Sequence, residues 1–292
     1  MRTDVEFVSE GTTLRGWLYL PEPADGQAPH GAIVVTCGFA SVKETFGHHD
    51  YPGVFCRAGF AVLVYDHANC GTSEGLPRQE LDPILQQRGY RDAITFLAAH
   101  PSVDPDRIGI WGTSYSGGHV LAVAAVDRRV RAVVSQAMTI SGHGNTIRRN
   151  TPEGLAGLRR RWAQERLDRM AGAPPTMVQA FGDDSDSVRF NRSLPEECRR
   201  NWRNEITLRS WEMYDEYEPA AFIERISPTP LLMIVPTADS MTPAEEALAA
   251  YGRAREPKAL VVVPGGHYVA DREQRATTSA AARDWFVRHL ST

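Results

Sequence analysis

Residues 108–118 have the sequence Ile-Gly-Ile-Trp-Gly-Thr-Ser-Tyr-Ser-Gly-Gly, in which Ser114 stands between an apolar run and a stretch of helix-forming residues. The run at residues 108–111 predicts a buried strand, and residues 115–126 predict the helix that follows it. Small residues two places before and after Ser114 are typical of a sharp turn whose backbone passes close to its neighbours. The pattern therefore predicts a strand, a tight turn with Ser114 at its apex, and a helix.

The pattern Gly-x-Ser-x-Gly is the signature of the nucleophile elbow, a turn that presents a reactive serine between a strand and a helix. The stretch around Ser114 matches this pattern with serine in place of the second glycine. A second serine matches it more closely by letter, in Gly71-Thr-Ser-Glu-Gly75. This stretch begins beyond a strand that we expect to end at Asp66, and it continues into Leu76-Pro77 instead of a helix. Because the turn requires a strand before it and a helix after it, Ser114 is the predicted nucleophile and Ser73 is a predicted loop residue. A purely structural glycine-rich turn is the remaining alternative.

Continuous apolar runs recur along the chain, as expected for the strands of a parallel sheet that is buried on both faces. They lie at residues 32–36, 60–66, 108–111, 130–135, 231–235 and 260–263. Helices are predicted at residues 51–58, 83–99, 115–126, 243–253 and 273–290. Alternation over residues 4–20 predicts an antiparallel hairpin that turns at Glu10-Gly11. The predicted fold class is α/β, with a mostly parallel central sheet, an N-terminal antiparallel hairpin and flanking helices.

The interval between the runs that end at residue 135 and begin at residue 231 is too long for an ordinary crossover connection. We predict a helical cap inserted over residues 141–226, with the core domain formed by residues 1–140 and 227–292. The insertion contains 14 arginines and 14 acidic residues. This balance favours a solvated helical surface with internal ion pairs over an anion-binding surface.

Three helices are predicted inside the insertion. Thr151 is the predicted N-cap of the first, Ser193-Leu-Pro-Glu196 is a predicted capping box for the second, and Leu208 opens the third. The aromatic residues of the insertion have two interpretations: they form the core of the cap, which we favour, or they contact a partly apolar substrate. They are Trp162, Trp202, Trp211, Tyr214 and Tyr217.

A serine hydroxyl is a poor nucleophile until a base removes its proton, so a histidine is needed near Ser114. Of the nine histidines, only His267 lies in the loop directly after the last predicted strand, and this glycine-rich loop could turn its ring toward the serine. His267 is therefore the predicted base. His143, at the start of the insertion, is the main competitor, and we interpret it as pocket lining or as a solvated loop residue.

The histidine in turn needs a carboxylate that orients it. Asp239 lies just past the buried run at residues 231–235, whereas no carboxylate follows the run that ends at Ser135. Asp239 is therefore the predicted acid. Asp271 is close to His267 in sequence, with little room to fold onto the far ring nitrogen, and we interpret it as an exposed loop charge or a charge at a helix N-terminus.

Stabilising a tetrahedral intermediate requires backbone N–H groups that point at its oxyanion. Tyr115 is predicted to supply one as the residue after the nucleophile, and Phe39, in the loop after the run at residues 32–36, is predicted to supply the other. Cys37 precedes this loop and is interpreted as a small buried residue rather than as a nucleophile.

Composition excludes several classes of partner. A net charge of −4 and a pI near 6.2 give no reason to expect nucleic acid or an anionic membrane. The N-terminal residues lack the apolar stretch of a signal peptide, and no apolar segment is long enough to span a bilayer, so we expect a cytoplasmic protein. The four cysteines lack a disulfide or metal pattern, so we expect reduced thiols. No metal or cofactor is predicted. The oligomeric state stays open, with a homodimer as one option.

Several motifs resemble a known family. They are Cys37-Gly-Phe39, Tyr65-Asp66-His67, Asp104-Pro-Asp-Arg-Ile108 and Trp111-Gly-Thr-Ser-Tyr-Ser-Gly-Gly118. With them the chain is similar to the α/β-hydrolase superfamily, and within it to a dienelactone-hydrolase-like group that includes the polyketide transferases. The resemblance implies the α/β-hydrolase fold, a triad of Ser114, Asp239 and His267, and a loop position for Ser73. Ala68-Asn69-Cys70 departs from the arginine and glycine that relatives usually carry there.

These observations lead to a functional hypothesis. We expect a serine hydrolase that cleaves an ester or thioester of a small to medium, partly apolar acyl substrate through an acyl-enzyme intermediate. An acyltransferase that uses the same residues to pass the acyl group to an alcohol is the alternative. A non-catalytic binding protein on the same fold is less consistent with the presence of all three triad residues.

Overall fold

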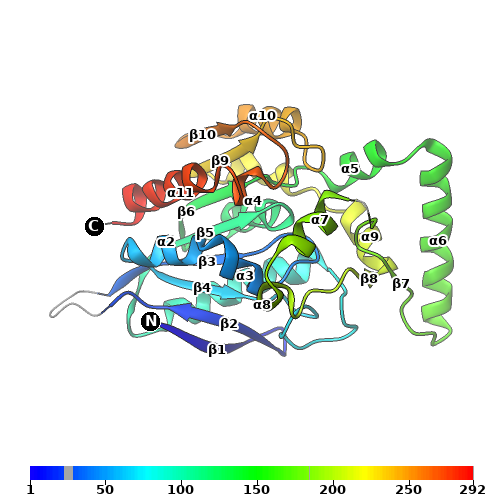
Figure 1. The fold of residues 1–292 in the computed structure, drawn as a ribbon, viewed down its shortest axis with the longest axis horizontal. Helices are drawn as coiled ribbons and strands as arrows, with labels where there is room; N and C mark the ends of the chain where they lie inside the picture. The colour runs from blue at the N-terminus through cyan, green and yellow to red at the C-terminus, as the bar shows by residue number, and fades with distance from the viewer. Residues whose placement is uncertain (23–28, 184, 292) are drawn as a thin grey trace.

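The computed structural model describes residues 1–22, 29–183 and 185–291, and its main element is an eight-stranded sheet (Figure 1). The strand order is β1-β2-β4-β3-β5-β6-β9-β10. The strands are β1 (Arg2–Ser9), β2 (Thr12–Tyr19), β3 (His30–Thr36), β4 (Ala61–Tyr65), β5 (Val103–Thr113), β6 (Val130–Gln136), β9 (Leu231–Pro236) and β10 (Lys258–Val263). β2 pairs antiparallel with β1 and β4, and all other neighbours are parallel. The predicted α/β class and the mostly parallel sheet are confirmed.

The N-terminal hairpin turns where the sequence predicts. Ser9 faces Thr12 in the β1–β2 pairing, which leaves a two-residue turn at Glu10 and Gly11. Both turn residues have positive φ, 49° and 79°. A turn with two left-handed residues matches the right-handed twist of the strands that it joins, which explains why glycine suits the second position.

Helices cover both faces of the sheet. Outside the β6–β9 connection they are η1 (Lys43–Thr45), α1 (Phe46–His49), α2 (Tyr51–Arg57), α3 (Pro83–Ala98), α4 (Tyr115–Val126), α10 (Ala244–Arg253), η3 (Val269–Asp271) and α11 (Arg275–Leu290). Successive residues of β3 face opposite sides: Val34 packs in the core with α3 and α4, whereas Ile33 and Val35 pack in the core with α2 and α11. Burial on both faces accounts for the continuous apolar runs in the sequence.

Most of the connection between β6 and β9 lies beyond one end of the sheet, with α6 at the outer edge of the molecule, whereas its last element packs on α4 in the main core (Figure 1). It consists of α5 (Gly142–Arg149), α6 (Pro152–Met170), β7 (Met177–Val178), α7 (Asp186–Ser193), α8 (Glu196–Arg199), β8 (Ile206–Thr207), α9 (Leu208–Asp215) and η2 (Pro219–Arg225). β7 and β8 form a small antiparallel sheet that the sequence did not predict. Strands of two residues are too short to show a period in the sequence.

The helix boundaries of this connection test the predictions made from capping residues. The Thr151 hydroxyl accepts the Gly154 N–H at 3.1 Å and caps α6, as predicted. The predicted capping box at Ser193 is wrong, because Ser193 ends α7 and its hydroxyl donates to the Phe190 carbonyl oxygen at 2.7 Å. The serine that caps α7 is Ser185. A Ser-x-x-Glu pattern is thus ambiguous where one helix ends shortly before another begins.

No helix within the described parts of the chain is both long and apolar enough to cross a membrane.

Candidate active site

Ser114 lies at the junction between β5 and α4, in a backbone conformation that few residues adopt. Its φ is 56° and its ψ is −116°, and its N–H donates to the Gln136 carbonyl oxygen at 2.9 Å. The turn leaves no room for a side chain at Gly112, where a Cβ would lie 2.2 Å from the Ser116 carbonyl oxygen. A strained residue held by its neighbours is often part of a functional site. The predicted strand, turn and helix around Ser114 are confirmed.

Ser116 occupies the position where the common motif has a glycine, and the structure shows how it is accommodated. Its side chain is fully buried and its hydroxyl donates to the carbonyl oxygen of Cys37, at the end of β3. The same hydroxyl lies 3.2 Å from His67 Nε2. Ser116 therefore links the turn to the neighbouring strand through a hydrogen bond that glycine could not make.

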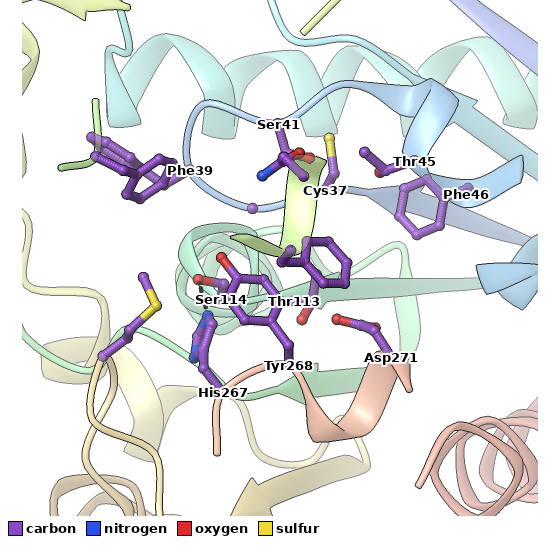
Figure 2. Close-up of a pocket in the computed structure, with 15 residues that line it drawn as sticks. Cys37, Phe39, Ser41, Thr45, Phe46, Thr113, Ser114, His267, Tyr268 and Asp271 are labelled. Atoms are coloured by element: carbon purple, nitrogen blue, oxygen red, sulfur yellow. Dashed lines mark hydrogen bonds between the residues drawn. The ribbon is translucent and has the colours of Figure 1, made fainter. Parts of the chain in front are cut away.

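The structure brings Ser114, His267 and Asp239 together. They follow the carboxyl ends of β5, β10 and β9, which meet at one edge of the parallel sheet. His267 Nε2 lies 2.9 Å from Ser114 Oγ, and Nδ1 lies 2.7 Å from Asp239 Oδ2. Figure 2 shows the first of these contacts, with the His267 ring directly beside Ser114. The arrangement can pass a proton from the hydroxyl to the imidazole while the carboxylate holds the ring.

The Asp239 carboxylate is buried but well supplied with donors. Its Oδ1 accepts the N–H groups of Met241 at 2.8 Å and Thr242 at 2.9 Å, and its Oδ2 accepts the Thr242 hydroxyl at 2.7 Å. Burial raises the pKa of this carboxyl, but attraction to His267 and the hydrogen bonds from His267 and Thr242 outweigh burial, so its pKa is lowered. Asp239 is therefore ionised at neutral pH.

Thr242 is a member of this group that the sequence analysis missed. Besides contacting Asp239, its hydroxyl oxygen lies 2.9 Å from the Ala137 carbonyl oxygen and 3.3 Å from His267 Nδ1. The spacing Asp-x-x-Thr directly after a strand is typical of a carboxylate that accepts local backbone N–H groups, and this signal could have identified it.

The competing residues lie elsewhere or make other contacts. Ser73 is a buried loop residue whose hydroxyl donates to the Asp66 carbonyl oxygen at 2.6 Å, which fits the predicted loop position. His143 is largely exposed on α5 and lies 3.0 Å from Asp215 Oδ1. Asp271 is half-buried and accepts from Gln136 Nε2 at 3.3 Å, so it is not an exposed loop charge; it lies in the first turn of the short helix η3, which fits the other interpretation.

Phe39 and Tyr115 flank Ser114 on two sides. The loop after β3 passes so close that a Cβ on Gly38 would lie 2.9 Å from Ser114 Cβ, and Phe39 follows it. Tyr115 is the first residue of α4, where backbone N–H groups lack partners inside the helix. The two rings meet edge to face with centroids 5.2 Å apart. Cys37 is buried, and burial raises the pKa of its thiol, which agrees with its interpretation as a small core residue.

Two cavities meet at Ser114. The first, here called the Tyr268 cavity, has a volume of about 60 Å³ (Figure 2). It is lined by Cys37, Gly38, Phe39, Ser41, Thr45, Phe46, Thr113, Ser114, Phe181, Phe190, Asn191, Met241, His267, Tyr268 and Asp271. The second, here called the Trp211 cavity, has a volume of about 20 Å³. It is lined by Phe39, Ser114, Thr139, Arg149, Phe181, Trp211, Tyr214, Met241 and Thr242.

The aromatic residues of the β6–β9 connection serve in part as its contact with the core. Tyr214 and Tyr217 pack against Tyr115, with ring centroids 5.6 and 5.1 Å apart, and Trp211 packs on Phe39 at 4.8 Å. Trp211 and Tyr214 also line the Trp211 cavity. Trp211 and Tyr214 therefore both pack against the core and border the space beside Ser114, and contact of these aromatics with a substrate stays a prediction.

No group of three or more potential metal ligands occurs within residues 1–22, 29–183 and 185–291.

The fold and its relatives define the class of protein: an enzyme of the α/β-hydrolase superfamily, as the sequence motifs led us to expect. The chain belongs to the X-Pro dipeptidyl-peptidase (S15) family, whose model matches residues 10–269.

Individual relatives indicate the kind of activity found in similar proteins. The polyketide transferase ATR5 of Stachybotrys chlorohalonatus is 32% identical over 91% of this chain and 90% of its own length. A thiohydrolase of Eupenicillium brefeldianum is 32% identical over 91% of this chain and 87% of its own length. The crystal structure of the α/β hydrolase GrgF from Penicillium sp. covers both chains completely, with a TM-score of 0.86 and 26% identity. These likenesses support hydrolase or acyl-transfer activity.

Proposed function

We propose that this enzyme cleaves an ester or thioester of a small to medium, partly apolar acyl group, with Ser114 as nucleophile, His267 as general base and Asp239 as the acid that orients the histidine. One observation carries the proposal: an unbroken series of hydrogen bonds runs from Ser114 Oγ through both nitrogens of His267 to Asp239, at 2.9 and 2.7 Å. A nucleophile, a base and an orienting group in this geometry are the components of acyl transfer.

In the first half of the reaction, Ser114 Oγ attacks the substrate carbonyl carbon and its proton passes to His267 Nε2. The imidazolium that forms is stabilised by Asp239, whose lowered pKa keeps it charged. The proton then passes to the departing alcohol or thiol, leaving the acyl group on Ser114. Water attacks this ester, gives its proton to His267, and the proton returns to Ser114 as the carboxylic acid leaves.

The tetrahedral intermediates of both halves carry a negative oxygen. The backbone N–H groups of Phe39 and Tyr115 are the proposed donors to it, because they belong to the two segments that flank Ser114. Each such donor is worth roughly 3 kcal/mol of transition-state stabilisation in comparable enzymes.

Residues 141–226 are proposed to act as a cap over this site. Tyr214 and Trp211 of α9 contact Phe39 and Tyr115 of the core and form one wall of the Trp211 cavity. Because that wall is aromatic, the apolar part of the acyl group is proposed to lie against it. The names of the relatives that are thiohydrolases favour a thioester as the bond that is cleaved.

A second candidate function is transfer of the acyl group to an alcohol instead of water. Two observations favour it: several relatives are polyketide transferases, and Ser114 borders a second cavity beside the Trp211 cavity. An alcohol in the Tyr268 cavity would replace water in the second half of the reaction without any other change.

The test is reaction with a fluorophosphonate probe, followed by intact-mass and peptide mass spectrometry on the wild type and Ser114→Ala. We expect one adduct on the Ser114 peptide of the wild type, none on the variant, and loss of hydrolysis of acyl thioesters in a variant that keeps its far-UV circular dichroism. An adduct at another serine, or full activity of Ser114→Ala, would overturn the proposal.

A further inference from the structure

The Tyr268 cavity contains more polar side chains than an apolar leaving group requires. Thr45, Asn191, Tyr268 and Asp271 all line it, together with the reactive face of Ser114 and His267. In Figure 2, Tyr268 and Asp271 lie on the segment that follows His267, and Thr45 lies across the cavity on the segment after β3. The polar groups thus come from several parts of the chain and face one space.

Three of these side chains each donate one hydrogen bond inside the protein. The Thr45 hydroxyl donates to the Val42 carbonyl oxygen at 2.8 Å. The Tyr268 hydroxyl donates to Ser187 Oγ at 2.7 Å, and Asn191 Nδ2 donates to the Ser187 carbonyl oxygen at 2.9 Å. Thr45 and Tyr268 can therefore offer a bound molecule only oxygen lone pairs, whereas Asn191 offers the lone pairs of its Oδ1 and the second N–H of its amide.

Asn191 has the clearest unused acceptor of these side chains. Its side chain is 5% exposed, and within the described parts of the chain its Oδ1 has no hydrogen-bond partner. A buried acceptor without a donor is unusual in a folded protein, and Asn191 is one of the residues that line the cavity. Asp271 adds a carboxylate to the same wall.

We propose that the Tyr268 cavity binds an acyl acceptor that carries two hydroxyl groups, one that reacts and one that donates a hydrogen bond to Asn191 Oδ1. The inference rests on the proposed function, since it requires the acyl-enzyme on Ser114. The reacting hydroxyl has to donate its proton to His267, so a single hydroxyl cannot also supply Asn191. A second O–H satisfies the remaining acceptor.

The chemistry is a plain exchange of esters. The acceptor oxygen bonds to the acyl carbon as its proton moves to His267 Nε2; the bond from that carbon to Ser114 Oγ then breaks, and the oxygen of Ser114 takes the proton back. The cavity of about 60 Å³ holds roughly four water molecules at about 15 Å³ each, which is enough for a small diol.

The experiment measures how the acyl-enzyme divides between acceptors. The wild type is acylated with p-nitrophenyl butyrate in equal concentrations of ethylene glycol and ethanol, and the two butyrate esters are quantified by mass spectrometry. We expect the glycol ester to exceed the ethyl ester by about fivefold, after correction for the two hydroxyls of glycol, because one additional hydrogen bond is made.

Two variants separate the acceptor role of Asn191 from a structural one. Asn191→Leu removes both the Nδ2 donor and the Oδ1 acceptor, and should bring the corrected ester ratio close to one. Asn191→Asp also loses the bond to the Ser187 carbonyl oxygen but keeps an oxygen acceptor, and should retain a preference for glycol. If both variants lose the preference equally, the Oδ1 atom is not the recognition element and the inference is wrong.

The failures of the two proposals can be told apart. If the wild type releases no p-nitrophenol at all and intact-mass measurement finds no butyryl group on Ser114, the proposed function fails. If the butyryl-enzyme forms but the wild type gives the two esters in a corrected ratio near one, only the diol inference is overturned.

Discussion

Helices α4 and α6 lie in the same chain but have opposite relations to the rest of it. Eleven of the twelve residues of α4 are buried, whereas only Trp162 and Glu165 are buried among the nineteen residues of α6. α4 packs against the central sheet and begins directly after Ser114. α6 is linked to α9 by an ion pair between Arg166 and Glu212, and it lies at the outer edge of the molecule (Figure 1).

The difference teaches which part of the molecule fixes the chemistry. Ser114 and Asp239 follow β5 and β9, whose positions are set by strand pairing and by cores on both faces of the sheet. The β6–β9 connection contributes walls to the two cavities through a few aromatic and polar side chains. We therefore expect changes near the strand ends to affect the rate of reaction, and changes in α6 to affect local stability alone.

The largest effect is expected for Asp239→Asn. The amide cannot balance the imidazolium and favours the wrong ring tautomer, so kcat should fall by about 10⁴-fold with little loss of folded protein. Steady-state hydrolysis of an acyl thioester gives the measurement. Asp215→Asn is the matched control, because Asp215 also contacts a histidine, His143, at 3.0 Å, but neither residue lines the two cavities at Ser114. A fall in kcat of less than tenfold for Asp239→Asn would contradict the conclusion that residues at the strand ends fix the chemistry.

A smaller effect concerns acid stability of the core beneath the turn. Burial lowers the pKa of His67 to about 3, and His67 Nδ1 has no hydrogen-bond partner among the residues described. Between pH about 6.5 and about 3 the unfolded chain therefore binds a proton that the folded chain does not, so the free energy of unfolding falls as the pH falls through this window. The contribution of His67 is about 1.4 kcal/mol per pH unit.

His67→Phe should remove that contribution while keeping an aromatic ring in the site. Urea unfolding at pH 7, 6, 5 and 4 should give a pH dependence that is weaker by close to one proton in the variant than in the wild type. Above pH 7 the two proteins should show the same dependence. An equal slope in both proteins below pH 6 would mean that His67 is not held neutral in the folded state.

The parts of the site that the sequence could predict are those fixed by strand ends. Ser114, Asp239 and His267 each follow a continuous apolar run, and the carboxyl ends of parallel strands meet at one edge of the sheet. Even Ser116, which departs from the common motif, sits in the turn that the flanking strand and helix require. The apolar runs and the order of the three residues along the chain were enough to identify these positions.

The remaining parts depend on contacts that have no local pattern. Asn191 reaches the Tyr268 cavity because α7 begins after Ser185, and the sequence placed a helix start at Ser193 instead. Asp271 could not be distinguished from an ordinary surface charge, because Gln136, the side chain that donates a hydrogen bond to it, is far away in the sequence. Such positions are set by tertiary packing, which a one-dimensional pattern does not contain.

The smallest effect is expected at Thr151, and it tests the independence of α6. Thr151→Ala removes the hydroxyl that accepts the Gly154 N–H, which costs about 1 kcal/mol of helix stability. Because α6 buries so little, this loss should appear as faster amide hydrogen exchange within α6 only, with kcat and KM unchanged within twofold.

If exchange also accelerated in α9, the ion pair between Arg166 and Glu212 would be coupling the two helices. A change in KM would then follow from Trp211 and Tyr214, since α9 carries both residues into the Trp211 cavity. Exchange and kinetics measured on one variant therefore decide whether α6 is a separate unit or part of the wall beside Ser114.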